Sequence, residues 1–348
     1  MPNKKFSLIT SIIRDAKKGK MFILVDDKDR ENEGDLVIPG SKCNSKIINF
    51  MAMHGRGLIC LALTKKQIDN LKLPLMSPVN KSRMQTAFTV SIEAKKGITT
   101  GISAQDRAKT VKTAIDPKSK KKDIVSPGHV FPLVARQGGV LVRAGHTEAS
   151  VDISKLAKLN PSSVICEVMN EDGRMARLND LFKFSKKHKI KLASIEDLIS
   201  YRIKYENLIW RISSKIINYK NEKIKIYKYK NKLGNNINFA ITKGILKPNK
   251  STPVRVLSAK IKDKNILNNF DIKKNLKLLF KYKNFLLLII NNDKIKDNNI
   301  RTLRYYGIGA QIIKDLKVKN MILISRTRKK IIGLEGFGLK ITKQKIIK

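Results

Sequence analysis

The chain has 348 residues, and its 73 Lys and Arg against 28 Asp and Glu give a formal net charge of +45. The length suits about two domains of roughly 150 residues each. A charge of this size means that nucleic acids and anionic membranes have to be considered as partners. The charge is uneven: residues 1–206 hold 38 basic and 21 acidic residues, or +17, and residues 207–348 hold the remaining 35 and 7, or +28.

Several classes of protein are excluded by simple patterns. The basic residues of the second half are spread evenly among Asn and Ile, without a basic stripe or an aromatic stacking platform, so we expect no nucleic-acid partner. Cys43, Cys60 and Cys166 are too far apart for a disulfide framework or a cysteine zinc site. The longest apolar run, 285–290, is far below the ~20 residues that span a bilayer. No signal peptide is evident at the N-terminus, and we expect a soluble, cytoplasmic protein.

Apolar periodicity and capping signals predict the elements of the first half in chain order. The predicted elements are a helix at 9–16 capped by Ser7, strands at 21–25 and 36–38, helices at 45–53 and 67–71, strands at 58–63 and 88–92, a helix at 104–114, a turn into a strand at 126–133, a buried strand at 164–168, and helices at 178–187 and 195–205. Strands that alternate with helices indicate an α/β or α+β domain with a substantial sheet.

The most unusual stretch is the loop between the first two predicted strands. Residues 26–35 contain six carboxylates, whose mutual repulsion needs a positive group among them. A divalent cation such as Mg²⁺ would serve, because it takes oxygen ligands, and Arg30 could grip a phosphate or a carboxylate. An acidic, solvated turn would explain the same charge run.

Later segments offer further polar groups, each with a simpler alternative. In Arg143–Thr147, the arginine, a glycine and the threonine hydroxyl can converge on one anion, while His146 offers a metal ligand or a proton shuttle; a solvated loop fits equally well. Glu167 lies in a buried-strand pattern, where its pKa would rise, unless alternation points it at solvent. His129 is a lone histidine of the kind that is usually structural. Residues 97–107 suit a phosphate site at a helix start, or an ordinary N-cap by Ser103.

These groups together suit the enolisation of a phosphorylated carbonyl compound. A cation that bridges adjacent oxygens would stabilise an enediolate, and a carboxylate or an imidazole would move the protons.

The first half also resembles a known family, 3,4-dihydroxy-2-butanone 4-phosphate synthase of riboflavin biosynthesis, from about residue 5 to 205. The resemblance rests on seven strings in order: DDKDRENEGD, HGRGLIC, TAFTVSIEA, TTGISAQDRA, PGHVFPL, GGVLVRAGHTEA and ICEVMNEDGRMAR. It implies an α+β domain over 1–206, with a mixed sheet flanked by helices. The implied activity converts D-ribulose 5-phosphate into the four-carbon phosphate and formate, with Mg²⁺ or Mn²⁺, through an enediol, dehydration, rearrangement and excision of C4.

The resemblance also implies roles for particular residues. Glu31 and His146 match the metal ligands, and His129 and Glu167 match the two positions essential to the chemistry. The matching substrate contacts are Arg30, Glu31, Asp35, Arg143, Ala144, Gly145, His146, Thr147 and Glu167. A homodimer with active sites close to the subunit interface is implied as well. The sequence departs from the family pattern at Ser126, often Arg in relatives, and at Ser77–Pro78, which replaces a more polar pair.

Residues 207–348 resemble GTP cyclohydrolase II in pieces, at 253–258, 303–312 and 333–339, which we interpret as a strand, a strand-turn-helix and a pair of Gly-rich turns. No cysteine follows Cys166 and no histidine follows His188, whereas the cyclohydrolase needs three thiolates to hold Zn²⁺. The stretch 260–299 is also short for the catalytic loops. We therefore expect a smaller, degenerate α+β domain without zinc or cyclohydrolase activity. The alternatives are residual GTP binding or turnover in a bifunctional enzyme, and a basic nucleic-acid-binding protein on an enzyme scaffold.

Overall fold

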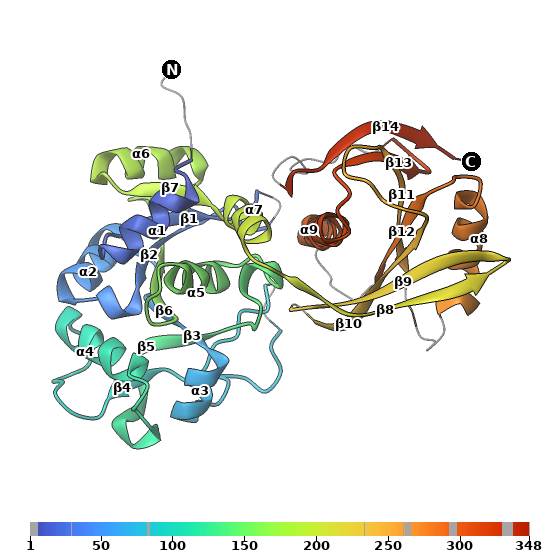
Figure 1. Cartoon of the computed structure of the whole chain (residues 1–348). Coiled ribbons are helices and arrows are strands. Elements are labelled where there is room, and N and C mark those ends of the chain that lie inside the picture. Colours follow the sequence, from blue (N-terminus) through green and yellow to red (C-terminus); the bar gives the residue numbers. More distant parts are fainter. Residues whose placement is uncertain are drawn as a thin grey trace. The chain divides into compact units, whose positions relative to one another are not determined.

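The computed structural model describes residues 6–28, 30–81, 84–232, 234–259, 261, 266–291, 298–328 and 337–347, with the backbone alone at 234–236 and 298–306. The chain forms two compact units, Met1–Ile199 and Ser200–Lys348 (Figure 1). Each unit contains a seven-stranded mixed sheet with helices packed on it. The predicted fold class is therefore confirmed for both halves. Among the described residues no helix is both long and apolar enough to cross a membrane.

The sheet of the first unit has the strand order β4-β5-β3-β6-β2-β1-β7, parallel at β1/β7 and β3/β5 and antiparallel elsewhere. Its strands are β1 (Phe22–Val25), β2 (Gly34–Pro39), β3 (Cys60–Thr64), β4 (Ile92–Ala94), β5 (Ile124–Ala135), β6 (Ser162–Glu167) and β7 (Lys191–Ser194). Its helices are α1 (Ile9–Lys17), α2 (Ser45–Phe50, continued by a π turn over Met51–Gly55), α3 (Lys65–Leu71), α4 (Ala104–Ile115), α5 (His146–Leu156), α6 (Leu178–His188) and α7 (Ile195–Tyr205, which passes into the second unit).

The two faces of this sheet are buried in different ways. One face carries Leu36, Leu61 and Cys166 into the main apolar core, which α2, α3, α4 and α6 close. The opposite face is covered mainly by α5, which lies across β2, β3 and β6, and α1 packs on α5 and against β1 and β7 (Figure 1). Strand alternation places Asp35 and Glu167 on this second face.

Helix α5 is buried along most of its length and packs through small and polar side chains. The Ser154 hydroxyl lies 2.8 Å from the Ser163 hydroxyl of β6, and Ser163 donates to the Ser150 carbonyl over 2.9 Å. These bonds satisfy polar groups that would otherwise be costly to bury. They also fix the start of α5 beside the end of β6 that carries Glu167.

Most predicted elements are confirmed, and four predictions are wrong. Leu8 rather than Ser7 occupies the N-cap position of α1, where no side chain makes a capping hydrogen bond. Regular pairing begins only at Ile92, since 88–89 form isolated bridges. Residues 126–133 belong to β5 rather than to a tight turn, although residues 126–129 bulge out between the pairings Glu93–Val125 and Ile92–Val130. Arg143–Thr147 is the start of a helix rather than the end of a strand; α5 was not predicted, because a helix buried on every side lacks an amphipathic pattern.

The second sheet has the order β14-β13-β11-β12-β10-β9-β8. Its strands are β8 (Ile209–Tyr219), β9 (Glu222–Asn231), β10 (Gly234–Lys243), β11 (Thr252–Ala259), β12 (Phe285–Asn291), β13 (Asn320–Ser325) and β14 (Lys340–Ile346), and its helices are α8 (Phe270–Leu279) and α9 (Asn298–Asp315). The two helices pack on opposite faces, α8 in one apolar cluster and α9 in the other (Figure 1).

The sequence predictions for this unit have mixed outcomes. The strand at 253–258 is confirmed as β11. The strand-turn-helix at 303–312 is wrong, because one helix, α9, runs through both glycines. A Cβ on Gly307 would lie 2.4 Å from the Ile203 side chain, so this glycine serves helix packing rather than a turn. Residues 333–336, with most of the predicted Gly-rich turns, and residues 260, 262–265 and 292–297 of the short stretch lie outside the described residues.

Candidate active site

The acidic loop between β1 and β2 is organised by its first residue, Asp26. This side chain is buried, and its Oδ1 accepts a hydrogen bond from the Glu33 amide over 2.9 Å. Its Oδ2 accepts from the Glu31 amide over 3.1 Å and from Arg30 Nη1 over 2.8 Å. Arg177 closes the loop from outside by donating to the Glu31 and Asn32 carbonyls over 2.7 and 2.8 Å. The loop is therefore a fixed structure rather than a solvated turn.

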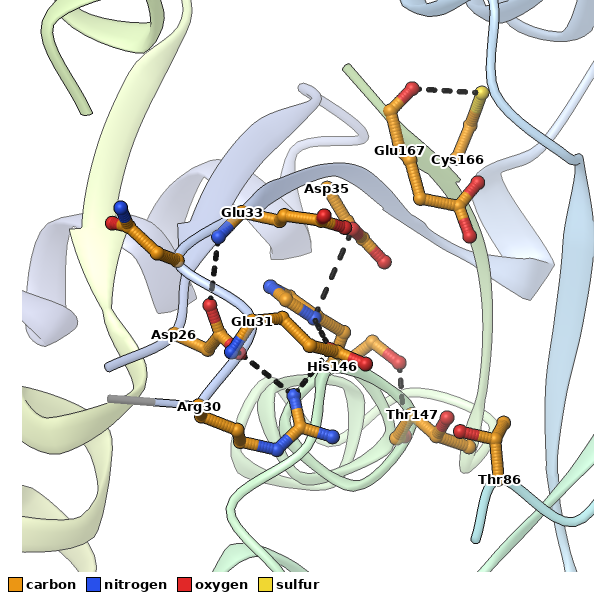
Figure 2. Close-up of polar contacts among 12 residues, drawn as sticks. Asp26, Arg30, Glu31, Glu33, Asp35, Thr86, His146, Thr147, Cys166 and Glu167 are labelled. Carbon is orange, nitrogen blue, oxygen red and sulfur yellow. Dashed lines mark hydrogen bonds and ion pairs between the residues drawn. The ribbon is translucent and has the colours of Figure 1, made fainter. Parts of the chain in front are cut away.

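The loop meets the first residue of α5. Nδ1 of His146 lies 3.8 Å from Glu31 Oε2 and 3.8 Å from Asp35 Oδ1 (Figure 2). Ligand atoms of Asp26, Glu31 and His146 all lie within 4.8 Å of one another, the one such group found among the described residues. The structure thus brings together the two residues predicted to bind metal and adds a third.

Two buried polar atoms at this place, His146 Nε2 and Asp35 Oδ1, have no hydrogen-bond partner among the residues that the structure describes. A buried polar atom without a partner costs free energy, roughly 1–3 kcal/mol, which persists where a bound ligand satisfies it. An imidazole nitrogen beside carboxylate oxygens is a donor set that fits a divalent cation.

Burial governs the electrostatics of the site. It raises the pKa of Asp35 well above its ordinary value, and the neighbouring Glu167 and Glu31 add to the rise. Burial also raises the pKa of Glu167 and lowers that of His146. The pocket therefore disfavours charge on each of these groups until a cation or a substrate compensates it.

Glu167 stands at the end of β6, directly opposite Asp35 of β2. Its Oε2 accepts a hydrogen bond from the Leu58 amide over 2.8 Å. A Cβ on Gly57 would lie 2.6 Å from the same Oε2, so the carboxylate can fold back here only because residue 57 is glycine. The strand pattern allowed Glu167 either to be buried with a raised pKa or to face solvent. In the structure it is half-buried, and its pKa is raised.

Arg143 is held beside the start of α5. Its Nη1 donates to Glu148 over 2.7 Å, and its Nη2 donates to the Met84 carbonyl and the Thr86 hydroxyl over 3.0 and 2.9 Å. Ala144 and Gly145 lead into the helix, and Thr147 lies in its first turn. The unpaired backbone N–H groups at a helix start, next to a fixed guanidinium, suit an anion.

His129 lies apart from this cluster, on β5. Phe131 of β5 pairs with Cys60 of β3, which pairs with Ile165 of β6. His129 and Glu167 are each two residues beyond this row, at the same end of the sheet and on the face that α5 covers. β3 lies between β5 and β6, so the backbones of these two strands are about 10 Å apart.

Three residues of the site were not predicted from the sequence: Asp26, Arg177 and Glu93, which contacts His129. Asp26 was visible as the first carboxylate of the acidic loop. Arg177 and Glu93 are far in sequence from the residues that they contact, and no local sequence pattern indicates them. The segment 97–107 proves to be the ordinary N-cap: Ser103 accepts from the Asp106 amide over 3.0 Å.

Comparison with known proteins decides the family. The family model of 3,4-dihydroxy-2-butanone 4-phosphate synthase matches residues 10–201. The chain belongs to the 3,4-dihydroxy-2-butanone 4-phosphate synthase family. The model of GTP cyclohydrolase II matches residues 271–345, so the resemblance of the tail is confirmed as well.

Relatives of this synthase family extend over nearly the whole chain. The riboflavin biosynthesis protein RibBA of Aquifex aeolicus (strain VF5) is 44% identical over 99% of this chain and 93% of its own length. The 3,4-dihydroxy-2-butanone 4-phosphate synthase of Photobacterium phosphoreum is 44% identical over 96% of this chain and 98% of its own. The chain is accordingly an enzyme of riboflavin biosynthesis.

Solved structures agree with this membership. RibBX, a two-domain 3,4-dihydroxy-2-butanone 4-phosphate synthase from A. baumannii, has a TM-score of 0.82 at 38% identity and covers 98% of this chain and 99% of its own. A 3,4-dihydroxy-2-butanone 4-phosphate synthase in complex with two magnesium ions has a TM-score of 0.55 at 37% identity and covers 57% of this chain and 98% of its own.

Proposed function

We propose that the chain converts D-ribulose 5-phosphate into L-3,4-dihydroxy-2-butanone 4-phosphate and formate. The observation that carries the proposal is the meeting of Glu31 and Asp35 with His146, each at 3.8 Å, at the start of α5. The excised carbon leaves as formate, so the two products together hold all the atoms of the substrate. Relatives that carry the name of this activity support the assignment.

Glu31 and His146 would hold Mg²⁺ or Mn²⁺, with Asp26 within reach. When bound, the cation would offset the negative charge that develops on the sugar oxygens during enolisation. The orphaned His146 Nε2 and Asp35 Oδ1 support this assignment, as does the two-magnesium complex of a related synthase.

The remaining polar groups divide the work of binding the sugar phosphate. Arg143 and the backbone of Ala144 to Thr147 would bind the phosphate, because a fixed cation and a helix start both attract it. Arg30 and Asp35 would contact the sugar hydroxyls from the opposite side. Arg30 Nη1 is shared by Asp26 and Glu31, so this arginine also keeps the loop in shape.

Glu167 and His129 would move the protons. A carboxyl group with a raised pKa holds a proton more readily and can still give it up, and burial raises the pKa of Glu167. His129 lies on β5, two strands away from Glu167 of β6, so the two groups would serve different carbons of one bound sugar.

The test is formate release from ribulose 5-phosphate, with and without a chelator. Glu31→Gln should abolish turnover, because it removes a charged ligand and leaves the shape nearly unchanged. Glu196→Gln is the matched control, since Glu196 is exposed in the first turn of α7. Full activity of the Glu31 variant, or of chelated wild type, would disprove the metal assignment.

We propose that the second unit has no cyclohydrolase activity. The sequence holds no cysteine after Cys166 and no histidine after His188, so the unit has none of the soft ligands that a catalytic zinc takes. Formate release from GTP, assayed with added Zn²⁺, tests this. Sustained turnover would establish the alternative, the bifunctional enzyme.

We also propose that the chain is a homodimer. Light scattering of the purified full chain tests this directly, and a monomer mass at micromolar concentration would contradict it.

A further inference from the structure

The imidazole of His129 has a carboxylate partner. Its Nδ1 contacts Oε1 of Glu93, the middle residue of β4. The Glu93 side chain is only 15% exposed, whereas that of His129 is 44% exposed. A mostly buried carboxylate therefore contacts one side of an imidazole that is partly exposed to solvent.

The backbone around this pair is irregular in a way that aims both side chains. The pairing of β4 with β5 shifts register, so that Ile92 faces Val130 while Glu93 faces Val125. Such bulges re-aim side chains and are enriched beside active sites. Ile92 and Val130 enter the main core, so Glu93 and His129 emerge together on the other face.

Two glycines make room for the Glu93 side chain. A Cβ on Gly101 would lie 1.8 Å from Glu93 Oε1, and a Cβ on Gly128 would lie 2.5 Å from Glu93 Cγ. Gly101 also has a φ of +88°, which other residues rarely adopt.

The segment that carries Gly101 is itself held firmly. Asp106 of α4 accepts hydrogen bonds from the Thr99 hydroxyl over 2.7 Å and from the Gly101 amide over 3.1 Å. These hydrogen bonds therefore hold Gly101 in place against the Glu93 side chain.

We propose that Glu93 is a positioning residue that holds His129 in the tautomer protonated at Nδ1, so that Nε2 is the atom that moves a proton. The chemical reason is that an ionised carboxylate only accepts hydrogen bonds, so the nitrogen facing it must carry the proton. Glu93 acts through His129 and does not touch the substrate. The inference rests on the role proposed for His129.

The first experiment measures kinetics on the full chain. Glu93→Gln removes the charge in the same shape, and its amide can donate to Nδ1 and so favour the opposite tautomer. We expect kcat to fall about 10²-fold or more, within the range that proton transfer contributes, with KM nearly unchanged. Glu93→Asp should recover part of the loss. Asp69→Asn is the control, because it removes an exposed carboxylate of α3.

A second pair of variants tests the position of the carboxylate rather than its charge. Gly101→Ala should lower kcat as Glu93→Gln does, because the new Cβ displaces Glu93 Oε1. Gly173→Ala is matched to it: Gly173 has a φ of +81° and nothing within 4 Å of an added Cβ, so it carries the same backbone strain without the displacement. Melting temperatures of both variants measure the backbone strain that they share, so a loss of kcat in Gly101→Ala alone is due to the displaced Glu93 carboxylate.

The tautomer itself can be read by ¹⁵N NMR of ring-labelled histidine, since the chain has only four histidines and His129→Gln assigns the signal. We expect Nδ1 protonated in wild type and a changed distribution in Glu93→Gln. An unchanged tautomer, or kcat within twofold of wild type in Glu93→Gln, would overturn the inference. Wild type that releases no formate would instead defeat the proposed function, and the NMR result would still decide whether Glu93 sets the tautomer.

Discussion

Asp35 of β2 and Glu167 of β6 occupy directly opposite positions in an antiparallel pair, on the face of the sheet that α5 covers. Two carboxylates that share such a place repel each other, and burial adds to the cost of ionising them. Both groups accordingly have raised pKa values, burial being the largest cause in each case. The folded protein therefore loses stability by keeping these two carboxyl groups side by side, unless a cation or a proton compensates their charge.

The first prediction concerns this cost. Asp35→Asn should raise the melting temperature of the chelator-treated protein by about 2–4 °C at pH 8, equal to about 1 kcal/mol, and abolish formate release. A carboxyl group whose folded pKa exceeds its unfolded value destabilises the fold increasingly as pH rises between the two, so the gain should vanish near pH 4. Thermal unfolding by circular dichroism at pH 4 and pH 8 measures this. An unchanged or lower melting temperature at pH 8 would contradict the repulsion argument.

The second prediction concerns the cation. Millimolar Mg²⁺ should raise the melting temperature of wild type, because a ligand bound only by the folded state stabilises it, by about 2.7 kcal/mol at 100 times its dissociation constant. Glu31→Gln should remove most of this gain, whereas Glu196→Gln should keep it. Differential scanning calorimetry with a MgCl₂ titration gives the readout without any turnover. A gain of equal size in the Glu31 variant would place the cation elsewhere.

The third prediction uses the close approach of Gly57 to Glu167. Gly57→Ala should lower kcat about 10²-fold, because the new Cβ would lie 2.6 Å from both Oε2 and the backbone oxygen of Glu167, so that the carboxylate and the strand end that carries it must shift. Gly309→Ala in α9 is the control: its Cβ would meet only Leu288, at an ordinary 3.4 Å, so activity should persist and helix stability should rise by up to about 1 kcal/mol. Steady-state kinetics of both variants test the pair. Normal kcat in Gly57→Ala would show that Glu167 does not need this position.

The sequence allowed the strands and most helices of the first unit to be predicted because their apolar residues are periodic. The resemblance to a known family predicted Glu31 and His146 as metal ligands and Asp35 as a substrate contact, and these three residues lie close together in the structure. The sequence did not predict α5, because this helix is buried on every side and contains polar residues such as Ser150 and Ser154, so it has no amphipathic pattern. Glu93 could not be found either, since its contact with His129 exists only through the bulge between β4 and β5. Local patterns indicate elements, whereas partners distant in sequence need the fold.

The fourth prediction concerns pH and a surface cluster away from the site. The ring of His188 packs among Phe50, His54 and Phe184, and burial, with His54 and Lys187, lowers its pKa. The unfolded chain therefore takes up this proton first, so stability is lost as pH falls through the unfolded value near 6.5. His188→Phe should reduce the fall in unfolding free energy between pH 7.5 and pH 5, and Lys187→Gln should reduce it less. Urea unfolding across this pH range measures the change in unfolding free energy. If wild type and both variants show the same dependence on pH, the lowered pKa of His188 is not its cause.

The fifth prediction addresses the second unit, where Tyr229 is fully buried and donates to Asp315 of α9 over 2.6 Å. Asp315 also accepts from Arg211 of β8 over 2.6 Å, so one carboxylate ties β8 and β9 to α9. Tyr229→Phe should lower the unfolding free energy by about 1.5–3 kcal/mol, the usual worth of a hydrogen bond to a charged group. Tyr205→Phe, at a residue 63% exposed, should change it by less than about 0.5 kcal/mol.

The single tryptophan of the chain, Trp210, lies in β8, so its fluorescence reports on the unfolding of the second unit. Urea titrations of the full-length variants, read at this tryptophan, measure the loss directly. Because Asp315 is itself partly exposed, water can replace one partner but not the buried phenol. Arg211→Met should therefore cost less than Tyr229→Phe, and the reverse order would show that the ion pair, not the buried hydroxyl, joins the helix to the sheet.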